Sequence, residues 1–216
     1  VDRGKNMVGA FYQPAFVYFN LHTLHTLPER EWDCGLAEMC KHALLESTGS
    51  IYKFMRMHVS DLRNAGAPAL RQAVLDSAAF KASVVARDER ESGLRAILNL
   101  GHTTAHAIES ITGYRRFSHG EAVARGLVTA LILSRDILDY SRTDEMLAFM
   151  RELRLPMDTA ELSGESLWDH MQYDKKAVQG VPEFVLLDQS ATAVYGRKVT
   201  REQFLNAWQE QRDRCG

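Results

Sequence analysis

The sequence predicts a mainly α-helical fold: a multi-helix domain with one small β-hairpin near its C-terminal end. Three observations favour this fold class. From Pro28 onward, apolar residues recur with the spacing of amphipathic helices over most of the chain. An apolar run at 122–133 is interrupted by Arg125 and is too short to span a bilayer, which indicates a buried helix. Two short apolar runs, 183–187 and 191–195, are separated by a polar turn, as is typical of a hairpin.

The first 28 residues differ from the rest of the chain. Residues 15–20 are aromatic and β-branched and follow Pro14, a pattern that predicts one buried strand. A single strand is not stable without partners. We therefore interpret residues 1–28 as the end of an α/β domain whose other strands are missing from this chain, and residues 29–216 as a helical domain.

Local start signals place the helices of this second domain. Pro28 and the acids that follow it suit a first helical turn. Ser118 and Glu121 match a capping box, which puts His119 at the mouth of a helix, and Thr200 and Gln203 match a second one. The predicted helices cover 29–46, 48–58, 67–87, 102–112, 119–140, 143–153, 166–172 and 201–212.

Composition excludes several classes of function. The chain has 216 residues, 45% of them hydrophobic and 25% charged, which is ordinary for a globular protein. The net charge of −2 gives no reason to expect nucleic acid or a membrane surface as partner. The three cysteines form no C-x-x-C pair, which favours a reducing compartment, and we expect a cytoplasmic location.

Three of the eight histidines lie close together in the sequence and predict a metal site. His102 and His106 are four residues apart and share one face of a helix, and His119 starts the next helix. Two histidines and one carboxylate are a common ligand set for catalytic Zn²⁺. Glu38, His102 and His119 would make that set, with His106 facing the substrate or supporting a ligand. The spacing is not H-E-x-x-H, so a protease of that type is unsupported.

Several lysine and arginine side chains could bind an anionic substrate near these residues. Each could instead have only a structural role. Lys41, three residues after Glu38, suits either a surface ion pair or an anion contact. Lys81, Arg95 and Asn99 flank a charged turn at 88–93, which a solvated loop would also show. Lys175 and Lys176 follow Asp174 in what is either a solvated charge cluster or a phosphate contact. Together these groups suggest a small substrate that carries phosphate and carboxylate.

The motifs occur along nearly the whole chain in the order found in one enzyme family. The sequence resembles the C-terminal part of the 3-dehydroquinate synthase family of the shikimate pathway, which leads to the aromatic amino acids. The matching segments are 4–14, 26–31, 35–38 with Lys41, 88–95, 99–103, 106–109, 119–123 and 174–176.

The resemblance implies which residues bind the metal, the substrate and NAD. It implies a site for Zn²⁺ or Co²⁺ at Glu38, His102 and His119. It places the substrate phosphate near a group of polar side chains, Asn6, Lys41, His106 and one of Lys175 and Lys176. It places the substrate carboxylate near Lys81 and Arg95, with Asn99 lining the same pocket. Lys5 and the segment Thr23, Leu24, His25 and Thr26 match positions that contact NAD in the family.

The resemblance also implies the reaction and its cofactors. Such enzymes use NAD and a metal ion to convert a phosphorylated keto acid, 3-deoxy-D-arabino-heptulosonate 7-phosphate, to 3-dehydroquinate and phosphate. The sequence contains no G-x-G-x-x-G, so we expect the N-terminal NAD-binding domain to be absent and the chain alone to be inactive. Members of the family form homodimers, and the resemblance therefore implies a homodimer. The apolar residues near Phe11–Phe19 favour one too.

Three other interpretations remain open at this stage. The chain could belong to another sugar-phosphate cyclase, of the 2-deoxy-scyllo-inosose or valiolone type, whose substrate lacks a carboxylate. It could be part of a metal-dependent polyol dehydrogenase, which would not need the cluster of cations. It could also be a non-catalytic helical binding domain, which would bind ligands without turnover.

Overall fold

We analysed a computed structural model, which describes residues 12–90, 93–159, 161–174 and 181–216. The described residues form a mainly helical fold with one two-stranded sheet, and the predicted fold class is confirmed. Each predicted helix is present, with its ends shifted by a few residues at most. The helices are α1 (Glu29–Leu45), α2 (Ser50–Met57), α3 (Pro68–Arg87), α4 (His102–Ile111), α5 (His119–Leu138), α6 (Thr143–Glu152), α7 (Gly164–Asp174) and α8 (Arg201–Cys215).

Helix α5 is the centre of the fold. It packs against α1, α4, α6, α8 and the first strand of the hairpin, and its residues are buried without a break from Ala122 to Ser134. This confirms the buried helix predicted from the apolar run. Arg125, which interrupts that run, is buried too, and its guanidinium pairs with Asp158 at 2.9 Å. A buried guanidinium requires such a partner, because an unpaired charge in the interior is costly.

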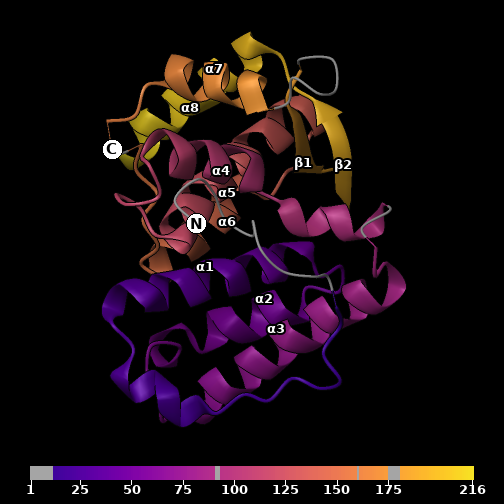
Figure 1. Ribbon diagram of the computed structural model, residues 1–216, viewed down its shortest axis with the longest axis vertical. Coiled ribbons are helices and arrows are strands. Elements are labelled where there is room, and N and C mark those ends of the chain that lie inside the picture. The colour runs from indigo at the N-terminus through magenta and orange to yellow at the C-terminus, as the bar shows by residue number, and fades with distance from the viewer. Residues whose placement is uncertain (1–11, 91–92, 160, 175–180) are drawn as a thin grey trace.

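The helices form two groups that meet at α1 (Figure 1). Helices α1, α2 and α3 pack against one another on one side, and α4 to α8 with the hairpin lie on the other. Helix α1 contacts α5 across this boundary. A site that uses α1, α4 and α5 together therefore lies where the two groups meet.

The hairpin pairs β1 (Glu183–Leu187) with β2 (Ala193–Lys198) in antiparallel fashion. The first strand matches the prediction, but the second was predicted at 191–195 and begins later. Asp188 explains the shift, since its carboxylate accepts hydrogen bonds from the backbone N–H groups of Ser190 and Thr192 and so holds these residues in the turn.

Residues 15–20, predicted as a strand whose partners lie outside this chain, are not in a strand here. These residues pair with no strand among the described residues, and their side chains are exposed, with Phe16 81% and Tyr18 78% accessible. A strand needs a hydrogen-bonded neighbour, and the described residues supply none here. Three short 3-10 helices were not predicted: η1 (Leu21–Thr26), η2 (Val59–Asp61) and η3 (Leu94–Asn99).

Among the described helices, none combines the length and the apolar character that crossing a bilayer requires.

Candidate metal centre

Glu38, His102 and His119 come together from three helices. Glu38 lies in the middle of α1, and each histidine is the first residue of its helix, α4 or α5. One ligand atom from each residue lies within 4.8 Å of the others. The Nε2 atoms of His102 and His119 are both 3.6 Å from Oε1 of Glu38. Tetrahedral ligands about 2.1 Å from a zinc ion are about 3.4 Å apart, so the spacing suits such an ion.

Hydrogen bonds on the far side of each imidazole orient the two rings. His102 Nδ1 donates to the carbonyl oxygen of Leu100 at 3.1 Å, and His119 Nδ1 donates to Oε1 of Glu109 at 3.2 Å. With Nδ1 carrying the proton, Nε2 has a free lone pair directed at the shared point. Metal-bound histidines in proteins are commonly held in this way.

The Glu38 carboxylate has one oxygen engaged and one without a partner. Oε2 accepts a hydrogen bond from Nζ of Lys41 at 2.8 Å, whereas the buried Oε1 has no hydrogen-bond partner. Burial alone would raise the pKa of Glu38, but the interaction with His119 and the charge of Lys41 outweigh it and hold this pKa far below its ordinary value. An ionised, unpartnered oxygen between two imidazole nitrogens fits a divalent cation.

The two histidines have opposite pKa shifts. Burial lowers the pKa of His102 to about 4, and the charge of Lys41 adds to that effect. The interaction with Glu38 raises the pKa of His119, against the effect of its partial burial. Metal binding requires both rings to be neutral, and His102 already is at physiological pH.

The other sequence-predicted residues lie at different distances from this cluster. His106 is exposed, and its ring stands edge-on to that of His102 with the centroids 5.5 Å apart. Lys41 is buried rather than on the surface, and burial lowers its pKa, with the nearby charge of Lys81 adding to the effect. Lys81 is exposed on α3.

Arg95 and Asn99 belong to η3, which leads directly into α4 and His102. The Arg95 backbone N–H donates to the buried Asp88 carboxylate, and its guanidinium donates to the carbonyl oxygen of Glu89. Asp88 therefore holds the start of η3, and Asn99 is half-buried at its end.

The remaining candidates divide into two groups. Thr23, Leu24, His25 and Thr26 form most of η1, where Asn20 caps the helix by accepting a hydrogen bond from the His22 N–H. The other candidates lie outside the described residues; they are Lys5, Asn6, Lys175 and Lys176.

Sequence reasoning missed Glu109 as part of the site. Glu109 is 3% exposed, in an otherwise apolar stretch of α4. An acid in such a stretch signals a specific partner, because a buried carboxylate is rare unless it is paired. The identity of that partner depends on how α4 and α5 pack, and the sequence alone does not show this.

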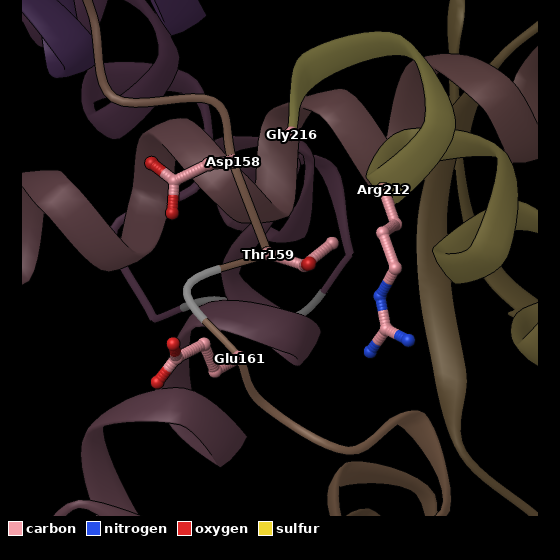
Figure 2. A pocket seen from close by; sticks show the side chains of 5 residues that line it. All are labelled: Asp158, Thr159, Glu161, Arg212 and Gly216. Atoms are coloured by element: carbon pink, nitrogen blue, oxygen red, sulfur yellow. The ribbon is translucent and has the colours of Figure 1, made fainter.

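A separate cavity of about 550 Å³ lies elsewhere in the molecule (Figure 2). It is lined by Asp158, Thr159, Glu161, Arg212 and Gly216, between the loop before α7 and the end of α8. None of its lining residues belongs to the ligand cluster. Its lining residues include no histidine and none of the residues predicted from the sequence to form the site, so this cavity is not the candidate site.

Comparison with solved structures shows which proteins have a similar fold. The fold is similar to that of 2-epi-5-epi-valiolone synthase from Streptomyces hygroscopicus subsp. jinggangensis 5008, solved with NAD⁺ and Zn²⁺ bound, with a TM-score of 0.78, 22% identity, and 90% of this chain and 55% of that chain covered. It is also similar to 2-deoxy-scyllo-inosose synthase, solved with carbaglucose-6-phosphate, NAD⁺ and Co²⁺, with a TM-score of 0.74, 22% identity, and 96% and 59% of the two chains covered. The chain therefore shares the fold of part of these two synthases.

The family follows from the sequence comparisons. The family model described as 3-dehydroquinate synthase C-terminal matches residues 35–177, and the one described as 3-dehydroquinate synthase N-terminal matches residues 1–34. The chain belongs to the 3-dehydroquinate synthase family.

Similar curated proteins carry the same name. 3-dehydroquinate synthase from Leptospira interrogans serovar copenhageni is 46% identical over 98% of this chain and 58% of its own length. The protein of that name from Desulforamulus reducens is 44% identical over 86% of this chain and 52% of its own length. The chain therefore spans a little over half the length of the curated relatives it matches.

Proposed function

We propose that this chain is the metal- and substrate-binding part of a 3-dehydroquinate synthase. The observation that carries the proposal is the cluster of Glu38, His102 and His119, in which an ionised carboxylate oxygen without a partner faces two imidazole nitrogens. The reaction converts 3-deoxy-D-arabino-heptulosonate 7-phosphate to 3-dehydroquinate and phosphate. When bound, a zinc or cobalt ion would polarise a substrate hydroxyl, and NAD would carry the hydride.

The residues of the chain bind and orient the substrate around that centre. Lys41 uses one N–H to hold Glu38 at 2.8 Å, and an ammonium group has two more donors for a phosphate oxygen. The exposed imidazole of His106 stands beside His102 and supplies a second group for the phosphate. Lys81 and Arg95 bind the carboxylate, and Asn99, at the end of η3 just before α4, contacts the same substrate.

Further residues complete the binding of phosphate and NAD in this proposal. Asn6 and one of Lys175 and Lys176 contact the phosphate, and Lys5 contacts NAD. In η1, the side chains of Thr23, His25 and Thr26 are exposed and available to NAD. These assignments rest on the family motifs.

The identity values favour this substrate over those of the other cyclases. Relatives named 3-dehydroquinate synthase are 42–46% identical to the chain, whereas the two related cyclases of known structure are 22% identical. Lys81 and Arg95 also provide two cations for the carboxylate that distinguishes the dehydroquinate precursor.

Activity is tested in a completed protein, made by joining this chain to the N-terminal residues of the Leptospira relative. With NAD, zinc and the heptulosonate phosphate, we expect release of phosphate and formation of 3-dehydroquinate, measured by chromatography. Glu38→Gln should abolish turnover, whereas Glu31→Gln, an exposed carboxylate on the same helix, should not. A product without a carboxylate, formed from another sugar phosphate in preference, would contradict the proposal.

The proposal includes a homodimer in the cytoplasm. The described cysteines are free, which suits a reducing compartment. The exposed Tyr12, Phe16 and Tyr18 favour association between chains. Light scattering that gives a monomer at every concentration would contradict the dimer.

A further inference from the structure

Two glycines of α5 bring its backbone into direct contact with the two other helices that carry ligands. A Cβ atom at Gly120 would lie 2.0 Å from Cα and 2.8 Å from the backbone nitrogen of Cys34 in α1. A Cβ atom at Gly126 would lie 2.1 Å from the carbonyl oxygen of Gly101, the residue before α4. Both contacts are with backbone atoms, which cannot move aside as the end of a side chain can.

The first contact lies one helical turn from the Glu38–His119 pair. On α1, Arg30, Cys34 and Glu38 are spaced four apart, so they lie along one face. All three meet the first turn of α5. Arg30 donates to the Glu121 carboxylate through Nε at 2.8 Å, Cys34 touches Gly120, and Glu38 faces His119 at 3.6 Å.

The second contact fixes the start of α4. Gly101 is the N-cap of α4 in a left-handed conformation, with φ of +77°, and it directly precedes His102. A Cβ atom at Gly101 would lie 2.8 Å from the backbone nitrogen of Leu127. The backbones at Gly101 and at residues 126–127 of α5 are therefore too close for a side chain on Gly101. The position of His102 relative to α5 depends on this approach.

We propose that Gly120 and Gly126 are positioning residues for the metal ligands. Gly120 sets the separation of Glu38 from His119, and Gly126 sets that of His102 from His119. A methyl carbon needs about 3.5 Å from a carbon atom and about 3.3 Å from an oxygen atom, so an alanine at either site would push the helices apart by on the order of 1–1.5 Å. Metal sites tolerate shifts of only about 0.2 Å in ligand distance. The inference rests on the metal site proposed above.

The test measures Co²⁺ binding by this chain, using the visible absorption of the bound ion, in Gly120→Ala and Gly126→Ala. We expect each variant to bind Co²⁺ at least about 10-fold more weakly than wild type and with an altered spectrum. Gly35→Ala is the matched control, since Gly35 lies in α1 next to Cys34 and its Cβ would meet nothing within 4 Å. It should bind as wild type does.

A second control separates ligand geometry from stability. Gly164→Ala would place Cβ 2.9 Å from Cδ1 of Trp208 and 3.0 Å from Cδ2 of Leu205, both side chains of α8, and should destabilise the fold without a direct contact to a helix that carries a ligand. Urea unfolding with a chelator present ranks the stabilities of all variants. At similar loss of stability, Gly164→Ala should keep wild-type Co²⁺ affinity and spectrum, unlike the two α5 variants.

Arg30→Gln weakens the contact between α1 and the first turn of α5 without adding an atom that clashes. It therefore remains informative if an alanine variant does not fold. Because the Arg30 side chain is 46% exposed and solvent weakens its ion pair with Glu121, we expect only about a twofold to fivefold loss of Co²⁺ affinity. Wild-type affinity and spectrum in the variants that fold would overturn the positioning role and leave the metal site standing. Wild-type protein that binds no Co²⁺ would overturn both.

Discussion

The side chain of Glu109 is 3% exposed and accepts a hydrogen bond from His119 Nδ1. It therefore decides which imidazole nitrogen of His119 faces Glu38. Glu109→Gln keeps the size of the side chain but removes its charge, which supports the basicity of the ring. We expect zinc affinity to fall about 10-fold, measured by competition with a chromophoric chelator. Glu202→Gln, an exposed carboxylate on α8, is the control, and equal affinity in both variants would contradict this role.

His42 gives the molecule a pH-dependent stability. Its ring is buried, its Nδ1 shares a hydrogen bond of 2.6 Å with Ser77 Oγ, and it lies beside Phe80. Burial lowers the pKa of His42 to about 4, and the charge of Lys41 adds to that effect. In the unfolded chain a histidine has a pKa of about 6.5. Between these values the unfolded chain binds a proton that the folded chain rejects, so stability falls as the pH falls from about 6.5 to 4.

The prediction compares wild type with His42→Asn, which can keep the hydrogen bond to Ser77 without titrating. From pH 7 to pH 5, the free energy of unfolding of wild type should fall by about 2 kcal/mol more than that of the variant. Urea unfolding at the two pH values measures this difference. His102, whose pKa is also low, is present in both proteins and cancels. If the free energy of unfolding falls by the same amount in both proteins, His42 does not titrate as described.

At the scale of the element, the start of α5 links helix capping to the site. Ser118 Oγ accepts a hydrogen bond from the Glu121 N–H, and the Glu121 carboxylate accepts one from the Ser118 N–H at 2.6 Å. Thr200 and Gln203 make the same reciprocal pair at the start of α8. The two caps are chemically alike, but only the first is followed by a proposed ligand.

We therefore expect Ser118→Ala and Thr200→Ala to have similar effects on stability and different effects on metal binding. Each should cost about 1 kcal/mol of unfolding free energy. Only Ser118→Ala should also weaken zinc binding, because the first turn of α5 carries His119. Urea unfolding in chelator and zinc competition measure the two effects. Zinc affinity that falls equally in both variants would mean that general stability, and not the cap, determines the site.

The same elements show what the sequence could predict. Both capping boxes, the buried α5 and the order of the helices depend on residues within a few positions of one another, and these predictions are confirmed. The strand at 15–20, whose predicted partners lie outside this chain, stays a prediction. Glu109, Gly120 and Gly126 were missed as parts of the site. Their proposed roles arise where separate helices pack together, and a pattern of spacing within one helix does not show that packing.

At the scale of the whole molecule, the proposed centre joins the two groups of helices. Glu38 belongs to α1, on the side of α2 and α3, whereas His102 and His119 belong to α4 and α5 on the other side (Figure 1). An ion held by all three ligands would cross-link the groups. Unfolding of either group would then release the ion, so metal binding should stabilise the fold as a unit.

This coupling predicts a thermal shift. A ligand that binds only the folded state stabilises it by about 2.7 kcal/mol when its free concentration is 100 times the dissociation constant. For a chain of this size, 1 kcal/mol corresponds to about 2–4 °C, so zinc should raise the melting temperature by roughly 5–10 °C. Calorimetry with buffered zinc and with chelator measures the shift. It should disappear in His102→Ala and persist in His58→Ala, which changes a histidine at the end of α2.

The variant pair also identifies where the ion binds. Zinc bound at scattered surface histidines would give a shift that both variants keep, because neither variant removes such sites as a group. A shift lost only in His102→Ala would mean that the ion acts through the three-helix cluster. If calorimetry instead resolves two transitions and zinc shifts only one of them, the two groups of helices unfold separately and the ion does not join them. The ion would then be held mainly by α4 and α5, and Glu38 would contribute little to the coupling between the two groups of helices.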